Sequence, residues 1–312
     1  GRIAAIDAAI AARSASITDA LPDAQHTEAL AMIARLQRMA DRPDAALAAY
    51  EKLRQREPEG AFDPLTALWV GKGLIETGKA EHALSWLEAA AASEQATKPV
   101  RAEAMLRLAQ AHERLEQWKP AIETYRKLLA SGRHFGDRGR LGLARSLAAS
   151  GDTDGALEEY NGLLYVEASE IAARALYESA LLHRDLADRL AETGSAARAE
   201  EERATARKRL NRLVILHNLP QLDPLPLRAL TELGRMEAAA GETDTAAKRF
   251  ELVARRADAP AWNLIGQAEL AALRSDKARA RSLLDRVVKD HAKDATAVAE
   301  ARQRRAQLGG GR

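Results

Sequence analysis

The sequence contains no cysteine, few aromatic residues and no long uninterrupted apolar segment. Without cysteine the chain has no disulfide framework, no thiol nucleophile and no cysteine-ligated zinc. No stretch approaches the roughly 18 consecutive apolar residues of a membrane-spanning helix. The 47 basic and 45 acidic side chains nearly balance, and a formal charge of +2 gives no general reason to expect a nucleic-acid or acidic-membrane partner.

Alanine, by contrast, is abundant and accounts for 69 of the 312 residues. It is the strongest helix former, whereas the β-branched and aromatic residues that favour strands are scarce. The remaining, larger apolar residues suffice for contacts between helices but not for a thick core around a sheet. The composition therefore predicts an all-α protein.

A recurring pattern of small, helix-ending and aromatic residues divides most of the chain into similar segments. Each copy has a small residue, a helix-ending residue seven positions later, an alanine five positions further on, and an aromatic residue or leucine after four more. Aromatic residues fill four of the six final positions, although they make up only 4 % of the chain. One pattern recurring at a regular spacing indicates a repeat protein. The copies are Ala34–Tyr50, Gly71–Leu87, Ala109–Tyr125, Ala144–Tyr160, Gly234–Phe250 and Ala268–Leu284.

The spacing between copies predicts pairs of antiparallel helices. The shared alanines lie at positions 46, 83, 121, 156, 246 and 280, and separations of 34 to 38 residues suit two helices with two short turns. The single gap of 90 residues has room for one longer pair, which residues 168–192 and 196–217 supply. Prolines in residues 219–227 predict an extended connector. A static connector is favoured over a hinge.

These segments resemble the tetratricopeptide repeat (TPR), in which small residues permit close helix contact and an aromatic side chain packs between helices. The resemblance covers residues 27–290, except for the pair at 168–217, whose length departs from the pattern. It implies a right-handed α-solenoid of stacked antiparallel helix pairs. Members of this family are mostly binding scaffolds.

The sequence predicts six segments along such a solenoid. Residues 2–20 form an amphipathic helix, either a cap or the second helix of an upstream repeat, whose apolar stripe would also serve a homo-oligomer. The segments are an N-terminal helix or cap over 1–26, four repeats over 27–167, an extended helix hairpin over 168–218, the connector over 219–227, further repeats over 228–293, and a C-terminal capping helix and tail over 294–312.

No segment carries a complete catalytic or cofactor-binding motif. Residues 73–80 approach a phosphate loop, but Ala80 stands where magnesium binding needs a hydroxyl group. No two of the seven histidines have the three- or four-residue spacing of a helical metal site. The basic segment 207–212 lacks interleaved aromatic residues. We therefore expect no enzymatic activity, no cofactor, no bound metal and no nucleic-acid partner.

In TPR solenoids the first helix of each pair faces the concave surface, so the exposed stripe of each first helix predicts partner-binding residues. That stripe mixes basic and apolar side chains, which suit a peptide with carboxylates and a few apolar anchors. The alternative is that the arginines only keep this face hydrated. Trp262 is either an exposed anchor or a residue of the helix seam. The predicted partner-binding residues are Arg35, Arg38, Lys72, Arg138, Arg145, Arg228, Arg235 and Trp262, and their predicted neighbours on the stripe are Leu68, Leu106, Gln110, Leu141, Ile265 and Glu269.

Together these features predict a non-enzymatic scaffold that binds a protein or peptide partner in its concave groove and helps to assemble a complex. The alternative is a non-catalytic regulatory or interaction region of a larger multidomain enzyme or membrane protein. The composition, rich in alanine and arginine, indicates a bacterium with a GC-rich genome. The sequence begins with glycine and not methionine, so we expect any signal peptide or upstream region to be already absent. Together with the lack of cysteine this slightly favours the periplasm or cell envelope, and the alternative is a cytoplasmic fragment.

Overall fold

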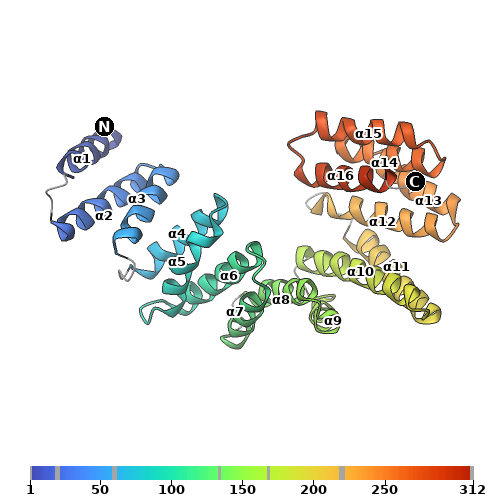
Figure 1. Ribbon diagram of the computed structural model, residues 1–312, viewed down its shortest axis with the longest axis horizontal. Coiled ribbons are helices and arrows are strands. Elements are labelled where there is room, and N and C mark those ends of the chain that lie inside the picture. Colours follow the sequence, from blue (N-terminus) through green and yellow to red (C-terminus); the bar gives the residue numbers. More distant parts are fainter. Residues whose placement is uncertain are drawn as a thin grey trace. The chain divides into compact units, whose positions relative to one another are not determined.

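The computed structural model describes residues 2–17, 22–57, 62–132, 135–166, 169–217 and 222–309. The regular elements within these ranges are α-helices, and within each of the two units described below the helices that follow one another in sequence pack side by side (Figure 1). The prediction of an all-α solenoid of helix pairs is confirmed. Among the described helices, none combines the length and the apolar character that crossing a bilayer requires. The chain divides into two compact units, residues 1–152 and 153–312.

In unit 1, consecutive helices form antiparallel pairs that stack through their first members. The first helix α4 contacts α6, and α6 contacts α8, in addition to the contacts within each pair. The helices of this unit are α1 (Arg2–Ser16), α2 (Asp23–Met39), α3 (Pro43–Arg56), α4 (Pro64–Glu76), α5 (Ala80–Ala92), α6 (Lys98–Arg114), α7 (Trp118–Ala130) and α8 (Gly136–Ser150).

Unit 2 repeats this arrangement around one longer hairpin. Its first helices contact one another in the order α10, α12, α14 and α16. The helices of this unit are α9 (Thr153–Asn161), α10 (Ser169–Glu192), α11 (Ala196–Leu216), α12 (Leu225–Ala239), α13 (Thr243–Ala254), α14 (Pro260–Leu273), α15 (Lys277–Asp290) and α16 (Ala295–Gly309). The pair α10 and α11 is the longer hairpin, with 24 and 21 residues against 15 and 12 for α12 and α13.

The repeated residues occupy equivalent places in the helix pairs. The shared alanine of every copy is completely buried, and so is the aromatic residue or leucine four positions later. Two copies begin with glycine because the paired helices approach closely there. A Cβ atom at Gly71 would lie 2.5 Å from the Leu87 side chain, and one at Gly234 would lie 2.5 Å from that of Phe250.

The helix-ending position of every copy has a left-handed backbone. Its φ angle lies between 56° and 92° at each of the six residues. A residue in this conformation ends a helix, and glycine adopts it without steric cost. The positions are Asp41, Gly78, Glu116, Gly151, Gly241 and Ser275. Half of the copies therefore use a residue other than glycine for the same turn.

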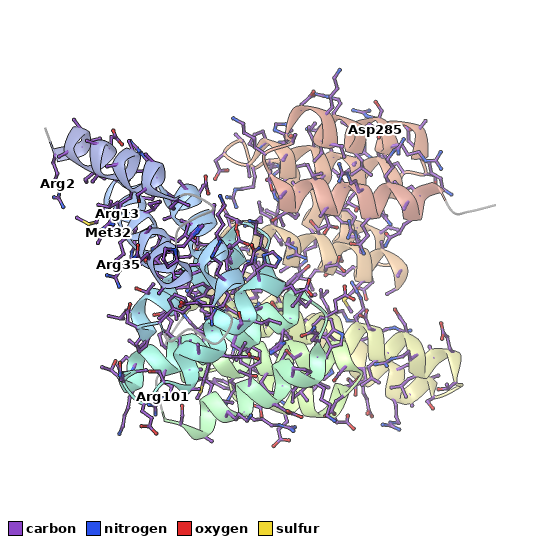
Figure 2. All side chains as sticks on the ribbon, turned by 60° about the vertical axis from the view of Figure 1, so that its left-hand side comes forward. Arg2, Arg13, Met32, Arg35, Arg101 and Asp285 are labelled. Carbon is purple, nitrogen blue, oxygen red and sulfur yellow. The ribbon has the colours of Figure 1, made fainter. Side chains whose placement is uncertain are left out.

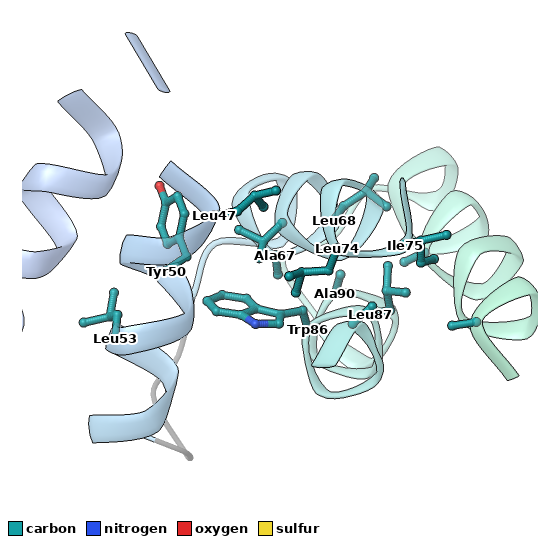
Figure 3. Packing of buried hydrophobic residues seen from close by; sticks show 14 of the residues in the cluster. Leu47, Tyr50, Leu53, Ala67, Leu68, Leu74, Ile75, Trp86, Leu87 and Ala90 are labelled. Atoms are coloured by element: carbon teal, nitrogen blue, oxygen red, sulfur yellow. The ribbon is translucent and has the colours of Figure 1, made fainter. Parts of the chain in front are cut away.

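The core of unit 1 is built around Trp86, which reaches from α5 toward α3 and lies beside Ala67 of α4 (Figure 3). Its ring meets that of Tyr50 edge to face, with 5.9 Å between centroids, and that of Phe62 at 4.4 Å. The guanidinium group of Arg54 stacks 4.2 Å from the centre of the Trp86 ring. A few large rings thus join α3, α4 and α5 in a core that otherwise consists mostly of leucine and alanine.

Two predicted boundaries differ from the structure. Helix α2 begins at Asp23, four residues before the predicted start of the repeats. Helix α12 begins at Leu225, so residues 225–227 are helical and not part of an extended connector. Pro226 is tolerated there because the first turn of a helix does not use its backbone N–H groups. Residues 18–21, 218–221 and 310–312 lie outside the described residues.

Candidate functional site

In unit 1, three of the predicted basic residues are open to a partner. Arg35 and Arg38 of α2 and Arg138 of α8 are exposed, and Figure 2 shows the Arg35 side chain projecting outward from its helix. Arg38 also makes a cation–π contact with Trp69 of α4, at 4.7 Å from the ring centroid. Within the described chain none of these three guanidinium groups is paired with a carboxylate.

Two further predicted residues of unit 1 are engaged in its own packing. The ammonium group of Lys72 on α4 lies 2.9 Å from a carboxylate oxygen of Glu103 on α6. Arg145 is half-buried on α8, where its charge acts on Tyr125 of α7. Burial raises the pKa of Tyr125, and so does the carboxylate of Glu113 that accepts its hydroxyl hydrogen, while Arg145 opposes them. Both basic residues therefore stabilise contacts between helix pairs.

In unit 2, six charged side chains of the first helices form a continuous charge network. Arg235 of α12 lies at its centre and donates hydrogen bonds to Glu269 of α14 at 2.5 Å, to Glu300 of α16 at 2.7 Å and to Glu232 of its own helix at 2.8 Å. Arg184 of α10 binds Glu232 at 2.5 Å, and Arg304 of α16 binds Glu269 at 2.9 Å.

The centre of the charge network is buried. The Glu269 side chain is 1 % exposed, and that of Arg235 is 16 % exposed. Burial alone lowers the pKa of Arg235, but the carboxylates of Glu269, Glu232 and Glu300 outweigh it and hold the pKa above its usual value. The three guanidinium groups face the three glutamate carboxylates, as buried charges require, and Arg184 also binds the exposed Asp185 at 2.8 Å. The prediction that Arg235 is available to a partner is corrected, because its hydrogen bonds are used within the chain.

A cavity of about 1000 Å³ lies beside this network. One wall belongs to the long hairpin, whose extra turns extend past the ends of α12 and α13, and another belongs to α16. The cavity also reaches Ala238–Ala240 at the end of α12, where small side chains leave room for an approaching backbone. The polar lining residues outside the charge network are Asp185, Asp188, Glu200, Arg203, Arg207, Thr243, Gln303 and Gln307.

Arg228 of α12 keeps its charge unpaired at the other end of the same helix. Its guanidinium group stacks 4.6 Å from the Tyr177 ring centroid, and its Nε–H is buried without a hydrogen-bond partner. In the part of the chain that the structure describes, no carboxylate is paired with it. A small cavity of about 170 Å³ includes Arg228, Arg174 and Thr296 in its lining, together with two carboxylates, Glu170 and Asp223, that are paired with Arg174 and Arg256. Arg228 thus retains donors for a ligand.

Several residues predicted on the exposed stripe are buried instead. Trp262 is 1 % exposed and belongs to the hydrophobic core of unit 2, so it is not an exposed anchor. The prediction failed because a first helix touches its own second helix, the second helix before it and the neighbouring first helices. Together these contacts cover most of its circumference. The other buried positions of the predicted stripe are Leu68, Leu106, Leu141, Ile265 and Glu269.

Sequence reasoning also missed the partners of Arg235. Glu232 lies three residues before it, and Glu300 lies four residues before Arg304, so each helix carries opposite charges on one face. This local spacing could have indicated from the sequence that these arginines pair with carboxylates of the same chain. The contacts across helices join residues 34 and 65 positions apart and come only from stacking.

Comparison with known proteins supports the repeat architecture. A family model described as tetratricopeptide repeat matches residues 28–60 and 103–131, which contain most of α2–α3 and α6–α7. No curated protein matches the sequence.

Three solved structures show a similar fold at low identity. The apo form of RapI has a TM-score of 0.62 at 12 % identity, covering 98 % of this chain and 96 % of its own. A tetratricopeptide repeat protein from Parabacteroides merdae has a TM-score of 0.58 at 13 % identity, and the match covers 88 % of this chain and 96 % of that protein. PilF from Pseudomonas aeruginosa has a TM-score of 0.52 at 17 % identity, and the match covers 77 % of this chain and 97 % of PilF.

Proposed function

We propose, from the premise that this chain is a tetratricopeptide-repeat protein, that it is a non-catalytic scaffold whose first-helix faces bind an acidic peptide segment of a partner protein. Repeats of this family serve protein–protein interaction. The proposal extends to assembly of a complex in a bacterial cell envelope. Two of the similar structures come from bacteria, which agrees with the origin that the composition indicates.

The observation that carries the proposal is the contrast between paired and unpaired arginines on the first helices. Arg235, Arg184 and Arg304 are neutralised within the chain, whereas Arg35, Arg38, Arg138 and Arg228 have no carboxylate partner among the described residues. An unpaired guanidinium group offers two parallel donors that match a carboxylate. These four residues are therefore the proposed contacts for acidic side chains.

The same architecture supports binding by preorganisation. Stacked helix pairs hold the arginines in place before a partner arrives, so little conformational entropy is lost by the scaffold on binding. Within unit 2, the cavity beside the charge network offers a separate recess with polar walls and small side chains. Binding energy is then expected to concentrate in a few contacts.

Affinity capture from the source organism tests this proposal. We compare the wild type with the variant Arg35→Glu/Arg38→Glu/Arg138→Glu and with Arg228→Glu, and we verify folding by circular dichroism. The matched control, Lys52→Glu/Lys119→Glu/Arg126→Glu, makes the same charge change at exposed residues of second helices. We expect a partner to be lost with the first-helix variants and retained by the control. The proposal is contradicted if the first-helix variants are folded and still bind the partner. It is also contradicted if the control variant loses the partner to the same extent.

A further inference from the structure

Large hydrophobic side chains gather at one corner of unit 2. Seven such side chains are exposed in the described chain, and four of them are Tyr165, Ile215, Leu216 and Leu252, with exposed fractions between 50 and 79 %. We call these four residues the apolar corner. Single exposed apolar residues are ordinary, but a cluster of them indicates a surface that binds something. None of the four lines the cavities described above.

Two contacts and the helical spacing of α11 place the four residues on one part of the surface. The guanidinium group of Arg212 stacks 4.1 Å from the centroid of the Tyr165 ring. Ile215 and Leu216 follow Arg212 by three and four residues on α11 and therefore share its face of the helix.

Leu252 joins this group from the neighbouring second helix. Arg249 of α13 donates a 3.0 Å hydrogen bond to the side-chain oxygen of Asn211 on α11. Because both helices run antiparallel to α12, they run in the same direction. Ile215 and Leu252 each lie one turn beyond this hydrogen bond, so the two exposed side chains stand at the same level.

The residues around the apolar corner are predominantly basic. Lys208 and Arg212 share its stripe of α11, and Lys248 and Arg255 flank Leu252 on α13. Glu251 also lies here, 2.9 Å from Arg255. The same stripes carry exposed Asp244 one turn before Lys248 and exposed Glu201 two turns before Lys208, so the excess of basic residues is confined to the ends of the stripes beside the apolar corner. Cations are favoured near the C-terminal ends of helices, and Lys208, Arg212 and Lys248 have no carboxylate partner in the described chain. The overall charge of +2 conceals this local excess.

We propose that the apolar corner contacts the surface of a membrane that contains anionic lipids. Tyr165, Ile215, Leu216 and Leu252 enter the interface between headgroups and acyl chains, and Lys208, Arg212 and Lys248 bind the headgroups. Protruding apolar side chains beside cations suit a flat anionic surface, whereas a peptide ligand needs a groove. The contact is reversible because few side chains insert.

This inference is independent of the proposed peptide-binding function. The apolar corner belongs to second helices and to the turn after α9, whereas the charge network and Arg228 belong to first helices. A protein bound to lipid through the corner therefore keeps its first-helix residues available. Failure of one proposal leaves the other unaffected.

Vesicle flotation with the intact chain tests the inference. We expect the wild type to float with phosphatidylcholine vesicles that contain phosphatidylglycerol, and not with phosphatidylcholine alone. Raising the salt concentration should weaken this binding, because the headgroup contacts are electrostatic. Ile215→Ser/Leu252→Ser and Lys208→Gln/Lys248→Gln should each weaken it about tenfold or more. Leu65→Ser, at an equally apolar and 61 % exposed position of unit 1, is the control and should bind as the wild type does.

Insertion can be observed directly because the chain has no cysteine of its own. An environment-sensitive fluorophore on Ile215→Cys should shift to shorter wavelength with anionic vesicles, and the same label on Leu65→Cys should not. Absence of wild-type binding, equal weakening in the Leu65→Ser control, or an unshifted label at position 215 overturns the inference. Binding of an acidic apolar peptide at the corner in place of anionic vesicles also overturns it.

Discussion

At the residue scale, Arg235 shows how one side chain joins three helices of unit 2. It belongs to α12 and binds carboxylates of α12, α14 and α16 at the same time. Its neighbours Glu269 and Glu300 are almost fully buried, so they depend on guanidinium groups for their hydrogen bonds. Buried charges of this kind are costly to leave unpaired, whereas exposed ion pairs contribute little.

We expect Arg235→Met to lower the free energy of unfolding of unit 2 by about 3 kcal/mol, because three carboxylates would lose a shared partner. Urea denaturation followed by circular dichroism measures this change. Arg255→Met is the control, since Arg255 is largely exposed and its loss should cost less than about 1 kcal/mol. The double variant Arg235→Met/Glu269→Met should recover part of the loss. Equal effects of the two single variants would show that the network does not stabilise the fold.

Residue-scale predictions from sequence succeeded where the governing contact is local. The pattern that selected Ala46 and Tyr50 also predicted that both are buried, because the two residues belong to one helix face. The environment of Trp262 could not be predicted in this way, because it depends on contacts with other repeats. A tryptophan at the start of a helix can face solvent or a neighbouring repeat, and only stacking placed it in the core.

At the scale of elements, the closeness of paired helices depends on glycine at two positions. Gly71 of α4 faces Leu87 of α5, and Gly234 of α12 faces Phe250 of α13. In each pair the second helix presents a large buried side chain exactly where a Cβ atom on the first helix would stand. Helix packing at this distance leaves no space for an additional methyl group.

Gly71→Ala and Gly234→Ala should therefore each destabilise the protein by about 1–3 kcal/mol, because overpacking forces side chains or helices to move. The control is Gly136→Ala at the beginning of α8, where a Cβ atom meets nothing within 4 Å. That substitution should be neutral or stabilising by up to about 1 kcal/mol. Thermal unfolding of the three variants tests the comparison, and a similar change in Tm for all three would contradict it.

Most elements could be predicted from the sequence, because each repeat encodes its own helix pair and turn. The long hairpin was expected at 168–192 and 196–217 and is observed at Ser169–Glu192 and Ala196–Leu216. The connector was misjudged because proline is compatible with both an extended segment and the first turn of a helix. Leu225–Leu227 adopt the helix, where Leu227 enters the core of unit 2.

At the scale of the whole molecule, each unit has a core of its own. The described cluster around Trp86 lies entirely in unit 1, and the clusters around Leu176 and Trp262 lie entirely in unit 2. Repeat proteins are stabilised mainly by contacts within repeats and between neighbouring repeats. The boundary between the units divides the copy Ala144–Tyr160 at its turn, but each unit keeps the hydrophobic clusters named above and is therefore expected to be a stable structure.

We predict that fragments 1–152 and 153–312 each fold when produced alone. Each should show a helical circular dichroism spectrum and cooperative unfolding in urea. The two spectra, weighted by length, should add up to that of the full chain. An unfolded fragment would show that its core depends on contacts from the other unit.

The two sides of unit 2 also differ at this scale. On the first-helix side, the charge network balances three arginines with three glutamates beside a large cavity. On the second-helix side, Lys208, Arg212 and Lys248 lie beside exposed apolar side chains and have no carboxylate partner among the described residues. This difference is the basis for proposing two separate interactions, one with a peptide and one with a lipid surface.

By itself, the sequence determined the helices, the turns and the repeat architecture of this protein. Each of these depends on residues within one repeat, such as the alanines that fit between paired helices and the helix-ending position that recurs as Gly78, Gly151 and Gly241. The tertiary structure alone decided which charges are paired and which side chains remain exposed. Arg235 meets Glu300 across 65 positions, and Arg249 of α13 binds Asn211 of α11, because stacking brings together faces that no single repeat specifies.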